Sequence, residues 1–191
     1  MDFRMLWEKI VEFTNSQAAL YVYLALLFGL FFLYRLKKRS NVKRLMADDR
    51  FSSAKLFASV ISSPMAISAE GQIGIVHGAF APPYIIHMKD INGFGMYFDG
   101  HSVAGSDNAE KSALLFKGLA ALITNRMREK TKKVNLVFFM EDKSIVNVTL
   151  FSGGSRLISV IRESTQTEIK NLLSELENVE ANIKQTNSLQ D

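Results

Sequence analysis

Three histidines are the side chains with the most informative potential chemistry in this chain, because imidazole binds metals and transfers protons near neutral pH. His77, His87 and His101 lie 10 and 14 positions apart on different predicted strands. Metal-ligand pairs on one element usually fall at shorter, fixed spacings. The nearest carboxylates, Asp90 and Asp99, are typical of turns. We therefore predict no metal site and interpret the histidines as surface or half-buried residues.

The sequence motifs that mark common catalytic sites are missing. The chain has no cysteine, which excludes thiol catalysis, disulfides and Cys-based zinc sites. It has neither the Gly-x-Ser-x-Gly elbow of serine hydrolases nor a phosphate loop ending in Gly-Lys-Ser/Thr. Residues 91–95 lack the glycine spacing of a dinucleotide site, and residues 153–155 are typical of a strand-to-helix connection, although such a turn can also hold an anion. We predict no enzyme and no cofactor.

The positive charge of the chain is concentrated in one short segment. The net charge is +4 and the pI about 9.3, values that would suit a nucleic-acid-binding protein. Residues 35–44, however, carry six basic and no acidic side chains, whereas residues 45–191 carry 15 basic and 16 acidic ones. Nucleic-acid-binding domains have a basic face of their own, so we predict no nucleic-acid partner. Beside a membrane, each cation contributes about 1 kcal/mol of attraction to anionic lipid.

This basic segment directly follows a long uncharged run. Residues 13–34 contain no charged side chain. As a helix they would extend over about 33 Å, enough to cross a hydrocarbon core about 30 Å thick. Tyr21, Tyr23 and Tyr34 lie near the ends of the strongly apolar part, where amphipathic rings favour the membrane interface. We predict a transmembrane helix over residues 13–36.

A cleaved signal peptide and a buried core helix are the two alternatives to this membrane span. A signal peptide is disfavoured by the acidic residues Asp2, Glu8 and Glu12, and by a basic cluster in place of a small-residue cleavage site. A core helix is disfavoured because residues 18–33 present no polar face. Both stay open as alternatives.

The distribution of lysine and arginine predicts the orientation of the span. Arg4 and Lys9 precede it and six basic residues follow it, so the positive-inside rule places the C-terminal part in the cytoplasm. We expect a single-pass protein of the inner (plasma) membrane, with residues 1–12 as a short amphipathic tail outside. The residues expected at the membrane surface are Arg35, Lys37, Lys38, Arg39, Lys43 and Arg44.

Alternating apolar residues and turn signals predict antiparallel strands after the basic segment. Residues 70–71 and 99–100 are typical hairpin turns, and the glycines of residues 90–95 predict a bend or bulge. The clearest hairpin pairs residues 134–140 with residues 144–151. The other expected strands are residues 55–62, 65–69, 72–77, 84–89, 96–98 and 101–103.

Two helices are expected in the same part of the chain. The first is predicted over residues 109–129, as a buried or membrane-apposed helix whose apolar surface only Lys117 interrupts. The second covers residues 155–184, and a capping box at residues 165–168 could restart it.

A second basic cluster begins near the end of the first predicted helix. It is typical of a helix C-terminus followed by a solvated loop, and it would also suit a second contact with lipid headgroups or a partner. Its residues are Arg126, Arg128, Lys130, Lys132 and Lys133.

The second predicted helix carries an apolar seam with three- and four-residue spacing. The seam covers about two heptads, which is marginal for a free coiled coil. It would pack on the protein's own sheet, or on a second copy or a partner helix. Its residues are Ile169, Leu172, Leu176, Val179 and Ile183.

The pattern predicts an α+β fold: one transmembrane helix, then a cytoplasmic antiparallel sheet or partly open barrel with an inserted helix and a C-terminal helix. On residues 65–77, 84–91 and 99–100 and the last hairpin, it resembles bacterial membrane-anchored proteins with a pleckstrin-homology-like domain. The resemblance covers about residues 55–180, although the helix at 109–129 departs from a plain pleckstrin-homology core. It implies a domain that binds lipids, peptides or protein surfaces. The expected segments are a tail (1–12), a transmembrane helix (13–36), a basic juxtamembrane linker (37–52), a cytoplasmic domain (53–184) and a polar tail (185–191).

These features favour a membrane-anchored binding or assembly module that contacts lipid, another membrane protein or a second copy of itself. One alternative is a membrane-tethered ligand sensor or enzyme that uses a pocket between sheet and helices. Another is an oligomeric structural component of a secretion, conjugation or phage-exclusion system, in which the C-terminal seam would be exposed.

Overall fold

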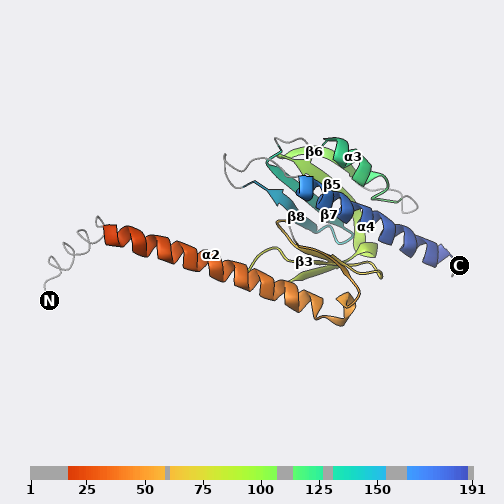
Figure 1. Ribbon diagram of the computed structural model, residues 1–191. Helices are drawn as coiled ribbons and strands as arrows, with labels where there is room; N and C mark the ends of the chain where they lie inside the picture. Colours follow the sequence, from red (N-terminus) through yellow and green to blue (C-terminus); the bar gives the residue numbers. More distant parts are fainter. Residues whose placement is uncertain (1–16, 59–60, 107–113, 127–130, 154–162, 189–191) are drawn as a thin grey trace.

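The protein has an α+β fold in which a long N-terminal helix leads into two four-stranded antiparallel sheets and a C-terminal helix (Figure 1). The N-terminal part of α2 (Gln17–Met46) projects away from the sheets, and its C-terminal end lies beside the first sheet. The predicted α+β class and the long apolar helix are confirmed. The computed structural model describes residues 17–58, 61–106, 114–126, 131–153 and 163–188.

The first sheet is a simple meander in the order β1-β2-β3-β4. The predicted hairpin at residues 70–71 is confirmed, since β2 and β3 pair antiparallel around Gly71, whose φ of +82° favours glycine. The strand expected over residues 55–62 extends only to Phe57. The elements of this sheet and of its two short 3-10 turns are η1 (Asp49–Phe51), β1 (Lys55–Phe57), β2 (Met65–Ile67), β3 (Gln72–Ile75), β4 (Tyr84–His87) and η2 (Met88–Asp90).

The second sheet has the order β6-β5-β7-β8, so that its strands do not follow one another along the chain. Asp99 and Gly100 both have positive φ, 51° and 88°, as a tight hairpin turn requires. The predicted irregularity in residues 90–95 is confirmed as a register shift between Ile91 and Gly93. The strands are β5 (Ile91–Phe98), β6 (His101–Ser106), β7 (Lys133–Met140) and β8 (Ile145–Ser152).

Backbone hydrogen bonds join the two sheets at two places. The N–H groups of Ser62 and Ser63 donate to the carbonyls of Leu150 and Thr149 on β8, each at 2.9 Å. At the other place, the N–H of Glu141 donates to the carbonyl of residue 90 at 2.8 Å. The single sheet or partly open barrel expected from the sequence is therefore divided into two sheets that meet at these contacts.

The main apolar core lies between the facing sides of the two sheets and is closed by α3 (Leu119–Arg126) and α4 (Glu163–Ser188). At its centre the Phe116 ring lies 5.3 Å from the Phe94 ring and 6.2 Å from the Phe138 ring. Aromatic pairs at these separations add to the stabilisation from burial alone.

The apolar seam of α4 is part of this core. Ile169, Leu172, Leu176 and Val179 are buried and Ile183 is partly buried against the same cluster. Of the alternatives left open above, the structure shows packing on the protein's own sheets. The assignment of this seam to a partner helix is corrected, because its side chains are already covered.

The expected bounds of α4 also change. The helix includes Glu163, so the capping box at residues 165–168 lies inside it and does not restart it. It continues to Ser188, so the polar tail expected from residue 185 begins within the helix.

Of the helix predicted over residues 109–129, the described part is helical only in α3, and residues 109–113 and 127–129 lie outside the described residues. α3 begins only after Gly118, whose φ of +69° is left-handed. The Glu180 carboxylate accepts the N–H groups of Leu115 and Phe116 at 2.7 and 3.0 Å, and Glu177 accepts that of Gly118 at 2.9 Å. These carboxylates of α4 satisfy N–H groups that a longer helix would have used internally.

Replacing Leu172 by alanine should destabilise the protein strongly, because it leaves a cavity in the core. The expected cost is about 2–5 kcal/mol, which lowers the melting temperature by about 2–4 °C for each kcal/mol. Thermal unfolding of the full chain in detergent, followed by circular dichroism, measures the change. The matched control is Asn171→Ala, an exposed neighbour on the same helix, and equal melting temperatures of the two variants would contradict the core position of Leu172.

Candidate functional site

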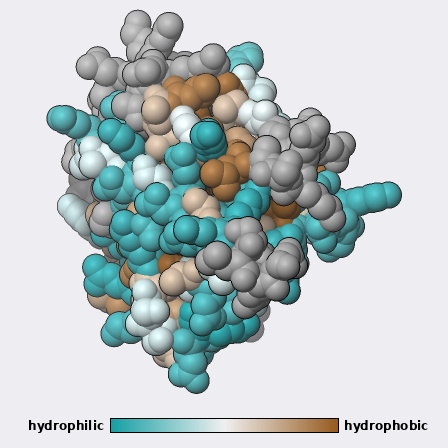
Figure 2. All heavy atoms as spheres, turned by 90° about the vertical axis from the view of Figure 1, so that its right-hand side faces the viewer, coloured by the Kyte–Doolittle hydropathy of each residue, from teal (hydrophilic) through white to brown (hydrophobic). Residues whose placement is uncertain are grey.

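The N-terminal part of α2 is a continuous apolar surface without cover from the domain. By length and composition, α2 could cross a membrane. A core helix or a signal sequence would pass the same test, and the 58–71% exposure of Leu20, Phe28 and Leu30 argues against the core helix. The opposite end of the domain is mainly hydrophilic, with separate apolar areas (Figure 2). An exposed apolar surface of this length marks contact with a membrane or another protein.

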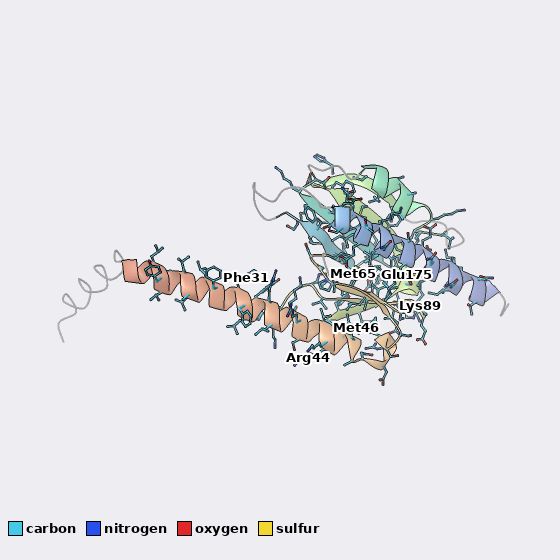
Figure 3. All side chains as sticks on the ribbon, in the orientation of Figure 1. Phe31, Arg44, Met46, Met65, Lys89 and Glu175 are labelled. Carbon is cyan, nitrogen blue, oxygen red and sulfur yellow. The ribbon has the colours of Figure 1, made fainter. Side chains whose placement is uncertain are left out.

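The C-terminal end of α2 packs on the outer side of the first sheet. Leu45 is buried there together with Phe51 from η1. A Cβ on Gly74 would lie 2.5 Å from Leu45 Cδ1, so the absence of a side chain on β3 lets the helix approach closely. Figure 3 shows Phe31 on the projecting part of the helix and Met46 at the docked end. The other members of this second cluster are Val42, Met46, Ala54, Ala66, Val76 and Ile85.

The basic juxtamembrane segment expected over residues 37–52, as a short helix or a linker, is helical as far as Met46. The helix continues without a break to Met46, and the boundary expected at residue 36 lies inside it. Val42, Leu45 and Met46 recur at three- and four-residue steps and give the helix a face to bury. Our prediction had weighed the charges of this segment and not this spacing.

Two polar side chains of α2 fix the adjoining chain. Asn41 is 2% exposed, and its side-chain Nδ2 donates to the carbonyls of Gly78, Ala79 and Ala81 at 3.2, 2.9 and 2.9 Å. Lys38 Nζ donates to the Ser62 carbonyl at 2.6 Å. The amide of Asn41 thus holds the loop between β3 and β4 against the helix. Sequence reasoning missed this residue, although it lies on the same face as Leu45.

The six basic residues predicted at the membrane surface follow the apolar part of α2. Lys38 is half-buried through its bond to the first sheet, and the Arg35 guanidinium lies 5.0 Å from the Phe31 ring centre. Five of the six cations, Arg35 included, are exposed to solvent. The exposed members are Arg35, Lys37, Arg39, Lys43 and Arg44.

The second basic cluster is only partly described. Lys132 and Lys133 are exposed at the start of β7, where their backbone N–H groups donate to Asp99 Oδ1 at 2.9 and 2.8 Å. Arg126 ends α3, which lies on the opposite side of the domain from α2 (Figure 1), and residues 128 and 130 are outside the described residues. The structure therefore does not bring α3 near the first basic cluster.

A cleft of about 530 Å³ lies between β4 and the turn that joins β7 to β8. In the described part of the chain β4 pairs only with β3, so its other edge is available for hydrogen bonding. All four residues of β4 line the cleft. The lining residues are Arg50, Gln72, Tyr84, Ile85, Ile86, His87, Asp90, Met140, Glu141, Asp142 and Ser144.

The charged groups around the cleft are mainly acidic. Arg50 is already engaged by Asp48, with Nε to Oδ1 at 2.8 Å and an Nη to Oδ2 at 2.7 Å, and these bonds lower the pKa of Asp48 to about 2. Hydrogen bonds from Ser144 lower the pKa of Asp142, which keeps that carboxylate ionised at neutral pH. With Asp90 and Glu141 also in the lining, the cleft favours cationic groups.

One buried acceptor in the cleft has no hydrogen bond within the described residues. The Oε1 atom of Gln72 is inaccessible and unpartnered, and an unmet buried acceptor costs about 1–3 kcal/mol. Gln72 pairs with His87 in the β3–β4 register, and both residues line the cleft. Nothing in the sequence marks Gln72, because a polar residue that opens a strand after a turn is ordinary.

The three histidines lie on separate elements. His77 and His101 are exposed, whereas His87 is half-buried in the cleft lining. No group of three histidine, aspartate or glutamate side chains among the residues of the described ranges is placed to hold a metal ion. Of the three histidines, His87 is therefore the one that lines the cleft.

Asn41→Ala should release the loop between β3 and β4. The loss of the amide bonds to three carbonyls costs about 1–3 kcal/mol, so amide hydrogen exchange in residues 77–81 should speed up by about tenfold or more. Exchange measured by mass spectrometry on the full chain in detergent tests this. Lys43→Ala, at an exposed position of the same helix, should leave the exchange unchanged, and equal behaviour of both variants would contradict the role of Asn41.

No protein-family model, curated protein or solved structure matches this chain. The function proposed next therefore rests on the residues and contacts of the chain itself.

Proposed function

We propose that the protein is a single-pass membrane-anchored binding module without catalytic activity, whose domain lies at the cytoplasmic face of the inner membrane. The observation that carries this proposal is the division of α2 into two halves. Its apolar N-terminal part is exposed over a length that suits a bilayer, and its C-terminal end is buried against the first sheet. Anchor and domain share one helix.

The orientation follows from the cations that mark the boundary between these two halves. Five basic side chains are exposed within about three helical turns after Tyr34, and none of them belongs to the cluster that buries Leu45. Cations in this position favour the cytoplasmic side and attract anionic headgroups. The N-terminus would then lie outside.

The cleft beside β4 is the proposed binding site for a partner. An extended segment of another membrane-associated protein, or of a second copy, would add as a strand to the free edge of β4. The acidic lining favours lysine or arginine in that segment, and the Gln72 side chain, whose Oε1 is buried and unpartnered among the described residues, would turn into the cleft to accept a hydrogen bond from it. Binding would thereby remove the free-energy cost of leaving a buried acceptor without a hydrogen bond.

A membrane-tethered ligand sensor or enzyme is the second candidate, and the same cleft favours it. Its volume of about 530 Å³ falls within the range of small-molecule sites, about 300–1,000 Å³. Oligomerisation through the α4 seam has no such support, because the seam is buried. An oligomeric component of a secretion, conjugation or phage-exclusion system would need another surface.

The pleckstrin-homology-like fold stays a prediction. Two antiparallel sheets followed by a C-terminal helix agree with it in outline. The order β6-β5-β7-β8 and the helix α3 between β6 and β7 depart from a plain meander. We therefore base the proposed binding mode on the cleft and not on the resemblance.

Replacing the five exposed cations after the apolar run by glutamine should disturb the membrane orientation, because it removes the positive bias on one side. A reporter fused to the C-terminus and active only outside the cytoplasm measures the change as new activity. The matched control removes five exposed lysines elsewhere, and should keep the reporter inactive. Uniform cytoplasmic orientation of the first variant would contradict the proposed role of these cations. The control lysines are Lys89, Lys117, Lys132, Lys143 and Lys170.

A photo-crosslinking amino acid at Tyr84 should capture the partner in cells, because this side chain is 46% exposed in the cleft lining. The control position is Leu122 on α3, similarly exposed at 41% and outside the cleft. Adding Gln72→Met should reduce the captured product without lowering the melting temperature, because it removes an acceptor that only the partner would satisfy. A product that is equal at both positions, or insensitive to Gln72→Met, would contradict the cleft as the binding site.

A further inference from the structure

The loop between β3 and β4 carries an exposed aromatic side chain next to the membrane helix. Phe80 is 82% exposed, more than any other large apolar side chain of the described residues. Its ring centre lies 6.4 Å from that of Tyr34. Tyr34 is the last residue of the uncharged run, and Arg35 follows it directly. Phe80 therefore lies at the level along α2 where the apolar surface gives way to the basic one.

Hydrogen bonds and prolines in the loop hold the backbone on both sides of the exposed Phe80. The carbonyls of Ala79 and Ala81, on either side of it, both accept bonds from the Asn41 amide at 2.9 Å, and Ala79 is buried. Pro82 and the proline after it further restrict the backbone. The chain is thus fixed on both sides of a phenylalanine that contacts little of its own domain.

A single exposed apolar residue needs no special explanation on a protein surface. Ile145, the first residue of β8, is an example in this chain, with 65% of its surface exposed. Phe80 differs because it continues the exposed apolar surface of α2, where Phe31 and Phe32 are 56% and 63% exposed. Exposed basic side chains, Arg35 among them, follow at the same end of that surface.

We propose that Phe80 inserts into the interfacial layer of the bilayer beside Tyr34, so that the loop of residues 77–83 is a second membrane contact of the protein. This inference rests on the membrane anchor of the proposed function. Aromatic rings favour the headgroup level of a membrane, and interfacial anchors set the tilt and rotation of a transmembrane helix. A ring that belongs to the domain would fix which side of the domain faces the lipid.

Tryptophan fluorescence in proteoliposomes tests this insertion. Trp7 is the only tryptophan, so Trp7→Phe gives a silent background for three single-tryptophan variants of the full chain. Phe80→Trp probes the loop, Leu27→Trp probes the anchor, and Ile145→Trp is the exposed apolar control away from α2. The vesicles contain phosphatidylcholine and phosphatidylglycerol, with bromine placed near the carboxyl end or near the methyl end of the acyl chain as the quencher.

We expect Phe80→Trp to show blue-shifted emission and quenching by lipid brominated near the carboxyl end. Leu27→Trp should be quenched most by lipid brominated near the methyl end, and Ile145→Trp should emit as in water. Quenching of Leu27→Trp without quenching of Phe80→Trp would overturn the loop contact and leave the anchor intact. No quenching in either would overturn the anchor and the loop contact together.

A second measurement separates insertion from a local effect of the new indole ring. The chain has no cysteine, so Phe80→Cys can be labelled uniquely with a nitroxide. In the same vesicles the label should be relaxed more by oxygen, which concentrates in lipid, than by a water-soluble nickel chelate. Stronger relaxation by the nickel chelate than by oxygen, as expected for a label at Ile145→Cys, would overturn the proposal.

Discussion

The close approach of α2 to the outer side of the first sheet is the contact on which the rest of the structure depends. Leu45 occupies the space that a side chain at Gly74 would take, and Phe51 closes the same cluster. Because β3 lies between β2 and β4 in the first sheet, this contact fixes the position of the sheet relative to the helix. Hydrogen bonds from Asn41 to Ala79 and from Lys38 to Ser62 then hold the loop after β3 and the segment before β2 against the helix. Apolar packing provides the stability, and these buried hydrogen bonds provide a unique orientation.

Local elements could be predicted from the sequence, but the way in which they pack together could not. Hairpins were predictable at residues 70–71 and 99–100, because a turn with positive φ demands glycine or a residue that tolerates that conformation. The apolar spacing of α4 was also clear, yet spacing alone cannot tell which surface will cover it. The way in which the two sheets meet depends on contacts such as that of Ser62 with Leu150, between residues 88 positions apart, and no local pattern predicts such contacts.

The candidate sites were less predictable than the fold for the same reason. Charge and hydropathy marked the anchor and its basic end, since both are properties of a contiguous segment. The cleft needs Gln72, residues of β4 and the turn after β7 in one place, which only the tertiary structure creates. Residues 114–118 were expected to be helical but are not, because Glu177 and Glu180 of α4 accept the backbone N–H groups of Leu115, Phe116 and Gly118. Hydrogen bonds with a helix that is distant in the sequence thus override the local helix propensity of these residues.

The unbroken helix between the apolar surface and the cleft acts as a spacer of set length. From Tyr34 to Met46 it rises about 18 Å along its axis, and Arg50, four residues further on, already lines the cleft. With the helix upright, the end of the cleft that Arg50 lines stands at about that height, whereas Tyr84 at the start of β4 follows Phe80 by only four residues. An extended chain gains about 3.3 Å per residue. A partner segment rooted in the same bilayer therefore needs about six residues to reach the far end of the cleft.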